Sequence, residues 1–189
     1  MAVTLRGLLF GVSDAHVYDA PEIEKASDIS YAEPRVRAKA QVPGCADSVA
    51  AFNAKCVGCG LCLKACGRQV LKLSSRPGRF LKPELDFRLG WCPPECHRCG
   101  EVCPAGALKP VTEPVKRQRR FGVAKVDLAR CLTAKGVTCN ACLRHCPVRA
   151  ITHDATARPV IDATKCIGCG ACEYYCPVRP ATAVQVEGL

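Results

Sequence analysis

The chain has 189 residues, 17 of them cysteine, with a formal net charge of +10 and only 10 aromatic residues. Cysteine at about 9% indicates either a disulfide scaffold or metal binding, and this length allows one medium domain or two small ones. No stretch reaches the roughly 18 apolar residues of a membrane span, so we expect no transmembrane segment.

Residues 1–46 contain no repeated cysteine motif. Acidic residues dominate early, and Pro21, Pro34 and Pro43 disfavour long helices. We therefore predict an irregular N-terminal arm over 1–46, either extended against the rest or serving as a docking arm for a partner. Asp47 is expected to cap a short helix over 48–55, with Val49 and Phe52 facing inward.

Four cysteine motifs follow, and they account for 16 of the 17 cysteines. Each motif has three cysteines in one segment, and its fourth cysteine lies four positions after the third. They are motif one (Cys56, Cys59, Cys62, Cys66), motif two (Cys92, Cys96, Cys99, Cys103), motif three (Cys131, Cys139, Cys142, Cys146) and motif four (Cys166, Cys169, Cys172, Cys176). Motif four is C-x2-C-x2-C-x3-C-P, the spacing with which bacterial ferredoxins hold [4Fe–4S] clusters. We therefore predict four [4Fe–4S] clusters, with these sixteen cysteines as iron ligands.

The spacing has a physical cause. Three thiolates on one tight loop can reach three corners of an iron–sulfur cube, and Gly168 and Gly170 let backbone amides approach it closely. The fourth cysteine, followed by a proline in three of the four motifs, is directed away from that loop toward a neighbouring cluster. Each oxidised cluster with four thiolates adds about −2, so the formal charge of +10 is weak evidence for nucleic-acid binding.

The segments between the motifs indicate short strands and turns. Val70–Leu73 and Phe80–Leu85 are predicted to form a hairpin with Arg76–Gly78 in its turn. Val160–Asp162 is predicted to return against Ala150–His153, and a short helix is expected after the third cysteine of each motif. The result is a small α+β unit used twice.

The four motifs together resemble a duplicated bacterial dicluster ferredoxin. The seven-residue gap between Cys131 and Cys139, and the sequence from Cys166 to Cys172, resemble more closely the four-cluster ferredoxin-type proteins (polyferredoxins) of periplasmic nitrate reductase and methylamine-utilisation systems, the NapF/NapG/MauM type. The resemblance covers roughly residues 44–189. Motif two departs from the pattern through its Cys92–Cys96 gap, and motif one has Gly67 in place of proline.

This resemblance implies an α+β fold of two bacterial dicluster ferredoxin-like modules behind the N-terminal arm, over 47–115 and 116–189. In each motif the first three cysteines would hold one cluster and the fourth would serve its pair. The pairing stays open: tandem pairing joins motifs one with two and three with four, whereas nested pairing joins one with four and two with three.

The sequence also leads to predictions for several residues other than the motif cysteines. Cys45 is a spare thiol, expected to have no function, with a redox or partner-linking role as the alternative. The basic run 116–120 is expected to be a solvated loop, or else to dock an acidic redox partner or an anionic membrane surface. His97 and His145 have no ligand duty. We expect Tyr174 and Tyr175 to shield clusters, and Arg68, Arg149 and Arg179 to temper cluster charge.

The sequence thus predicts an electron carrier, not an enzyme, because it contains no nucleotide-binding fingerprint and no nucleophile–base pair. It would relay single electrons through four clusters between redox partners, as a subunit or accessory of a larger oxidoreductase or membrane electron-transfer complex, without nucleic acid. The alternatives are a maturation factor for a metalloenzyme and a zinc-stabilised interaction protein. We expect a cytoplasmic location, with peripheral membrane attachment as an alternative, and export if the N-terminus is incomplete.

Overall fold

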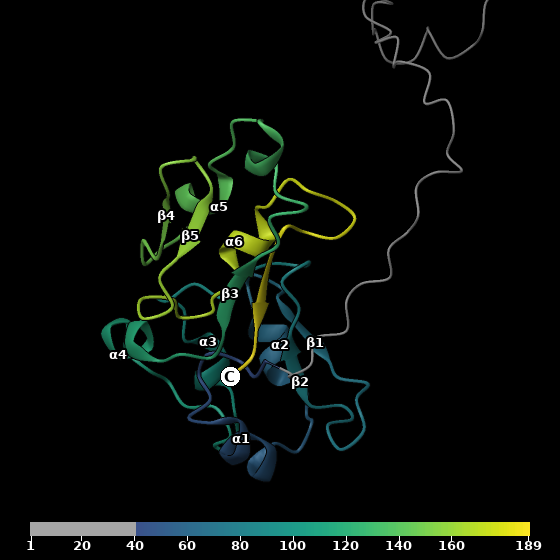
Figure 1. The fold of residues 1–189 in the computed structure, drawn as a ribbon. Helices are drawn as coiled ribbons and strands as arrows, with labels where there is room; N and C mark the ends of the chain where they lie inside the picture. The colour runs from purple at the N-terminus through teal and green to yellow at the C-terminus, as the bar shows by residue number, and fades with distance from the viewer. Residues whose placement is uncertain (1–40) are drawn as a thin grey trace, which may run out of the picture. The chain divides into compact units, whose positions relative to one another are not determined.

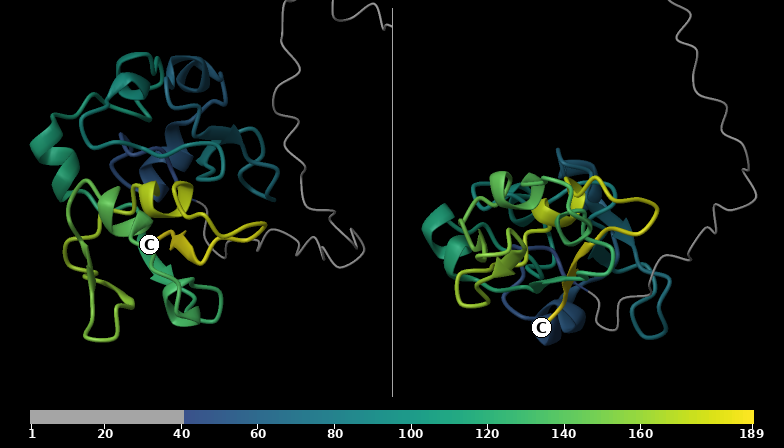
Figure 2. Two further views of the ribbon diagram at one scale, coloured as in Figure 1. Left: turned by 90° about the horizontal axis from the view of Figure 1, so that it is seen from above. Right: turned by 45° about the horizontal axis from the view of Figure 1, so that its top comes forward.

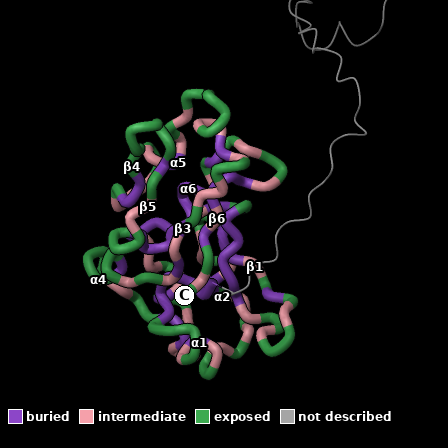
Figure 3. Tube along the Cα trace, in the orientation of Figure 1, coloured by how far each residue is buried: buried purple, intermediate pink, exposed green. Residues whose placement is uncertain are grey.

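The computed structural model describes residues 41–189, which fall in one unit. Residues 1–40 of the predicted arm, which was placed over 1–46, lie outside the described residues. Residues 41–46, which we had placed in the arm, are all buried (Figure 3). The described end of that segment therefore belongs to the folded core.

Short helices and strands alternate along residues 41–189 (Figure 1). The helices are α1 (Val49–Lys55), α2 (Leu61–Ala65), α3 (Arg98–Glu101), α4 (Glu113–Gln118), the 3-10 helix η1 (Thr133–Lys135), α5 (Ala141–Arg144) and α6 (Ala171–Tyr174). The strands are β1 (Leu71–Leu73), β2 (Pro83–Leu85), β3 (Val123–Val126), β4 (Ile151–His153), β5 (Pro159–Ile161) and β6 (Val184–Glu187). This small mixed architecture agrees with the predicted α+β class and with a ferredoxin-like dicluster fold.

The described strands form antiparallel pairs: β1 with β2, β3 with β6 and β4 with β5. β3 precedes motif three and β6 follows motif four, with Val126 opposite Val184, so this pair closes the C-terminal half around both motifs. In the N-terminal half, the segment before motif one is joined to later segments by single backbone hydrogen bonds. The Lys109 amide donates to the Cys45 carbonyl at 3.1 Å, and the Leu85 amide to the Gln41 carbonyl at 2.9 Å.

The predicted hairpins are present, with one correction. β4 and β5 pair with Ile151 opposite Ile161, and β1 and β2 pair with Leu71 opposite Leu85. The second strand of the first hairpin begins only at Pro83, however. Leu81 adopts φ +61°, a conformation that disrupts a strand, and Phe80 beside it is 69% exposed.

The predicted first helix is also present, with a different cap and a narrower buried face. The Ser48 hydroxyl accepts a hydrogen bond from the Ala51 amide at 3.0 Å, whereas Asp47 pairs with Lys109 and Arg119. Phe52 is fully buried as expected, but Val49 is 38% exposed. The apolar contact of this helix therefore depends mainly on Phe52.

The predicted helices of the motifs begin earlier than expected. In α2, α3, α5 and α6 the third cysteine of the motif is the second helical residue, so the helix contains this cysteine and does not follow it. Gly60 and Gly170 precede α2 and α6 with φ of +75° and +79°, a backbone conformation that favours glycine. The loop thus turns sharply into the helix just before the third cysteine.

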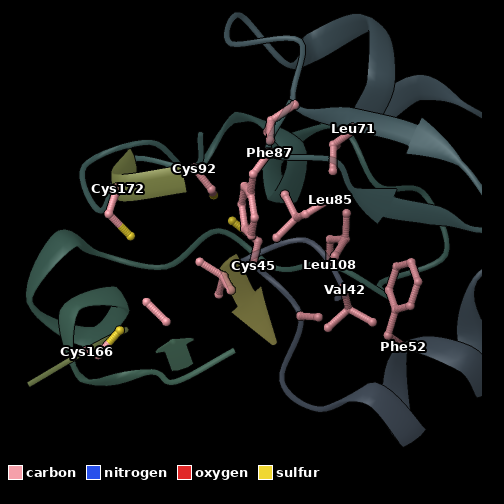
Figure 4. Close-up of a cluster of buried hydrophobic side chains, with 14 of the residues drawn as sticks. Val42, Cys45, Phe52, Leu71, Leu85, Phe87, Cys92, Leu108, Cys166 and Cys172 are labelled. Atoms are coloured by element: carbon pink, nitrogen blue, oxygen red, sulfur yellow. The ribbon is translucent and has the colours of Figure 1, made fainter. Parts of the chain in front are cut away.

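One hydrophobic core extends across both halves of the described chain. The two halves lie side by side (Figure 2), and the Cys92 amide donates to the Cys169 carbonyl at 2.9 Å. In Figure 4, Phe87 stands between the aliphatic side chains around Leu85 and the sulfur atoms of Cys92 and Cys172. The buried face of the N-terminal half is therefore packed directly against the C-terminal motifs.

Candidate cluster-binding sites

Three hollows in the described structure are each lined by four of the repeated cysteines. Site 1, of about 330 Å³, is lined by Cys56, Cys59, Cys62 and Cys103. Site 2, of about 360 Å³, is lined by Cys66, Cys92, Cys96 and Cys99. Site 4, of about 300 Å³, is lined by Cys146, Cys166, Cys169 and Cys172. Each site therefore combines three cysteines of one motif with the fourth cysteine of another.

The remaining four repeated cysteines gather in the C-terminal half, and we call this group site 3. Cys131 and Cys176 share a small buried cluster with Ala183. Burial, together with neighbouring Cys139, Cys131 and Cys176, raises the pKa of Cys142 to about 11. Electrostatic interaction of this kind requires proximity. Cys131, Cys139, Cys142 and Cys176 thus form a set of the same composition as the other three.

The geometry of these sets fits a cubic cluster. Within residues 41–189, no three Cys, His, Asp or Glu side chains converge closely enough to hold a single metal ion. The cysteines of sites 1, 2 and 4 instead surround a hollow, as the corners of a multi-iron core require. The four sulfur donors around each hollow therefore suit [4Fe–4S].

The surroundings of two ligand thiols, Cys62 and Cys169, disfavour their ionised form. Burial raises the pKa of Cys62 to about 11, with further contributions from Cys56, Cys59 and Cys103. Burial also raises the pKa of Cys169 to about 12. A coordinating metal deprotonates such thiols outright, so cluster insertion and the local charge balance are coupled.

Backbone amides at the sites add the hydrogen bonds that tune iron–sulfur clusters. The Ala150 amide donates to Cys146 Sγ at 3.2 Å. Such donors stabilise negative charge on sulfur and so raise a cluster's reduction potential.

Lys116 is the functional residue that the sequence did not reveal. We expected it in a solvated loop, but it lies in α4, is 1% exposed, and its ammonium donates to the carbonyls of Pro93, at 2.7 Å, and Cys96. Burial alone would lower its pKa, yet the neighbouring thiols of Cys92 and Cys45 raise it overall. A fixed positive charge therefore lies beside site 2.

The rest of the basic run connects segments of the chain. The Arg119 guanidinium contacts the Asp47 carboxylate at 2.9 Å. Arg117 donates to the Pro147 carbonyl at 3.1 Å, and Arg120 donates to the Thr164 carbonyl. The run is thus attached to both halves of the described structure, which corrects the expectation of a solvated loop.

Cys45 is fully buried and lies against site 2. Its thiol donates to the His97 carbonyl at 3.8 Å and hydrogen-bonds that of Cys99. This thiol–thiol bond, with burial, raises the pKa of Cys99, and the same bond lowers that of Cys45 to about 6. The spare cysteine is therefore a second neighbour of the site 2 sulfurs.

The remaining predicted residues occupy varied positions. Tyr175 is 36% exposed and stacks on His145, with ring centroids 3.7 Å apart, so it covers the histidine at the surface and is not a core shield. Arg68 lies over the Trp91 ring at 5.1 Å, and Arg179 donates to the Cys176 carbonyl. The sequence contains no periodic signal for these pairings.

The contacts between sites give them a spatial order. Sites 2 and 4 meet where the Cys92 amide bonds the Cys169 carbonyl. The pKa of Cys172, raised by burial well above its ordinary value, is raised further by Cys142 of site 3, so sites 4 and 3 are also neighbours. Sites 1 and 2 exchange fourth cysteines. The spatial order is therefore 1, 2, 4, 3.

This fold and these sites define a protein of the iron–sulfur ferredoxin class. The family model of the 4Fe-4S dicluster domain matches residues 55–107 and 135–179, just over half of the chain, in two segments. The chain therefore belongs to this family, and two dicluster segments with sixteen repeated cysteines correspond to four [4Fe–4S] clusters.

Among curated proteins, the chain is similar to ferredoxin-type proteins of two kinds. It is 35% identical over 130 residues to the methylamine utilization ferredoxin-type protein MauM of Methylophilus methylotrophus, covering 62% of this chain and 57% of the relative. It is 35% identical over 100 residues to the ferredoxin-type protein NapG of Escherichia coli K12, covering 51% and 43%. The chain spans about half the length of these relatives, and it is a NapG/MauM-like ferredoxin.

None of the helices formed by residues 41–189 combines the length and the apolar character that crossing a membrane requires.

Proposed function

We propose that the protein is an electron carrier that relays single electrons through four [4Fe–4S] clusters, as a non-catalytic subunit or accessory of a larger oxidoreductase. The main support for this proposal is that each hollow combines three cysteines of one motif with the fourth cysteine of another motif. This is the swapped arrangement of bacterial dicluster ferredoxins, in which adjacent clusters lie close enough to exchange electrons.

The proposed ligands follow the sites. Cys56, Cys59, Cys62 and Cys103 hold cluster 1, and Cys66, Cys92, Cys96 and Cys99 hold cluster 2. Cys131, Cys139, Cys142 and Cys176 hold cluster 3, and Cys146, Cys166, Cys169 and Cys172 hold cluster 4. This assignment favours tandem over nested pairing and corresponds to modules over 47–115 and 116–189, the first including the buried residues from 41 onward.

The order of the sites supports a path through the molecule. Electrons would pass along sites 1, 2, 4 and 3, because these are the pairs in contact. Each cluster supplies a one-electron redox centre when bound, and the chain's own residues set its potential through burial, hydrogen bonds to sulfur and the Lys116 charge. Sites 1 and 3 are then the two ends of the relay.

Partners are inferred from the relatives. MauM proteins are named for methylamine utilization, so we propose that this chain likewise serves one particular oxidoreductase system, as a redox partner of a larger complex. No feature of the described residues favours the maturation alternative.

Anaerobic purification of the full chain tests the proposal. We expect a brown protein with about sixteen iron and sixteen sulfide per chain, bleached by dithionite. Removing iron with a chelator is expected to unfold the protein, because the clusters fill the hollows of a thin core. A colourless protein containing zinc, or iron that dithionite cannot reduce, would overturn the proposal.

A further inference from the structure

The loops of motifs one and four have the same spacing, which allows a comparison position by position. Both read Cys-x-Gly-Cys-Gly-x-Cys, over residues 56–62 and 166–172. In motif four the loop is covered by other parts of the chain. Ile167 is 2% exposed and packs against Trp91 and Phe121, and Cys169 is 7% exposed.

Both glycines of the motif four loop touch this cover. A Cβ at Gly168 would overlap the Gly122 backbone, and one at Gly170 would overlap the Phe87 ring. The face of this loop is therefore tightly packed, against Gly122 of its own half and Phe87 of the N-terminal half.

In motif one the same face is uncovered in the described structure. Val57, the counterpart of Ile167, is 72% exposed, and Leu61, the counterpart of Ala171, is 43% exposed. A Cβ at Gly60 would meet no atom within 4 Å. Cys59 is exposed, whereas every other cysteine of the repeats is buried or half-buried. Site 1 is therefore the site whose thiols come closest to the surface.

Apolar side chains from a second segment extend this face. Leu81, 46% exposed, lies against Gly58, where an added Cβ would come within 3.3 Å of the Leu81 carbonyl oxygen, and Phe80 beside it is 69% exposed. Val57 and Phe80 are the most exposed large hydrophobic residues within 41–189. We call Val57, Cys59, Leu61, Phe80 and Leu81 the first-loop surface. An apolar surface of this kind marks an interaction site.

The chain segment that forms this surface is rich in basic residues. Residues 48–83 contain seven Lys and Arg and no Asp or Glu. Lys55 and Lys64 are exposed, and neither has an ion pair within residues 41–189. Glu101, on the neighbouring α3, is an acidic residue close to this segment, and its carboxylate lies 3.1 Å from the His97 ring. A partner that fits here therefore carries acidic groups around an apolar centre.

We propose that the first-loop surface is the docking face for an acidic redox protein, which exchanges electrons with the chain at site 1. This inference rests on the proposed relay and specifies its end. The partner would cover the motif one loop as Phe87, Trp91 and residues 121–122 cover the motif four loop. Lys55 and Lys64 would steer the encounter, and Val57 and Phe80 would be buried in the complex.

The test uses the full chain with its clusters and, as the probe, reduced flavodoxin, a small acidic one-electron donor. One electron leaves the flavin and one oxidised cluster is reduced, which bleaches the cluster absorbance in a stopped-flow experiment. The double substitution Lys55→Glu and Lys64→Glu is expected to lower the second-order rate at low salt at least about tenfold and to flatten its salt dependence. Val57→Ser with Phe80→Ser is expected to lower the rate at high salt.

Arg144→Glu is the matched control, because Arg144 occupies the position in α5 that Lys64 occupies in α2 and is likewise exposed. It should leave the flavodoxin rate within about twofold. Reduction by the viologen radical, a small reductant, should be the same in all variants, which shows that their clusters are intact.

Equal flavodoxin rates in the native chain and the Lys55/Lys64 variant, or equal losses in that variant and Arg144→Glu, would overturn the docking face. A rate that rises in the Lys55/Lys64 variant would also overturn it, since the face would then be covered by a second copy or by the acidic N-terminal residues. Failure of the viologen radical to reduce the native chain would instead overturn the relay itself.

Discussion

Single residues decide how site 2 differs from the other sites. Lys116 crosses from α4 to the carbonyls of Pro93 and Cys96, and Cys45 contacts the same group of thiols. A buried ammonium beside a cluster stabilises the reduced form, because reduction adds negative charge. We therefore expect cluster 2 to have the highest potential of the four and to retain an electron longest.

Replacing Lys116 by Met tests this expectation. Loss of the charge should lower the potential of one cluster by roughly 50–100 mV, given the strength of charge interactions inside proteins. Redox titration followed by electron paramagnetic resonance measures the shift. Arg158→Met, in the exposed turn between β4 and β5, is the control and should leave all four potentials nearly unchanged; a shift in both variants would contradict the assignment.

Gly170 and Gly60 provide a second comparison at the residue scale. Both have positive φ before the helix of their motif, but only Gly170 abuts Phe87. Each Gly→Ala substitution costs about 1–2 kcal/mol for the backbone conformation, and Gly170→Ala adds about 1–3 kcal/mol of overlap. In urea unfolding, monitored by the loss of cluster absorbance, the Gly170→Ala variant should therefore be much less stable than the Gly60→Ala variant. Equal stabilities would contradict the packing described.

At the scale of elements, the β1–β2 hairpin is stabilised by charges that the pattern of apolar residues does not reveal. Asp86, which follows β2, is 3% exposed and accepts a 2.6 Å hydrogen bond from Arg88, and Lys72 of β1 lies 3.1 Å away. Burial acts to raise the pKa of Asp86, but the bonds from Arg88 and Lys72 lower it overall below the ordinary 3.8.

This shift predicts a pH dependence. Because the folded-state pKa is depressed, the stabilisation from ionised Asp86 is complete above about pH 5 and is lost as the pH falls toward the folded value. Asp86→Asn should lower stability by about 1–3 kcal/mol at pH 7. The gap between the two proteins should narrow from pH 5 to pH 3 in anaerobic urea unfolding; a constant gap would show that the carboxylate charge is not the cause. Comparing the two proteins at each pH cancels any acid lability common to both.

At the scale of the whole molecule, the main question is which cysteine serves which cluster. Cys176→Ala should release the cluster of site 3 and leave that of site 4, since Cys176 gathers with Cys131 and not with its own motif. Alkylation under anaerobic conditions, read by peptide mass spectrometry, should then label Cys131, Cys139 and Cys142. Cys146→Ala is the reciprocal variant and should expose Cys166, Cys169 and Cys172. Labelling of each motif's own three cysteines would refute the swap.

The cluster chemistry could be predicted from the sequence, because the ligands of each motif are local. In motifs one and four, three thiols within seven residues need only a tight turn to converge. The sequence also predicted both hairpins and the α+β class. It did not determine that Ser48, not Asp47, caps α1, since both residues can accept the same bond.

Which loops are covered could not be predicted, because it depends on contacts between distant segments. Motifs one and four have nearly identical sequences. Phe87 and Trp91 nevertheless pack against the motif four loop and not against the motif one loop. The burial of Lys116 arises in the same way, from contacts between segments that are distant in the chain. The local spacing of the cysteines determines that each loop can bind a cluster. The exposure of the loops, the charges around them and the order of the sites depend on long-range packing, which no periodic pattern in the sequence encodes.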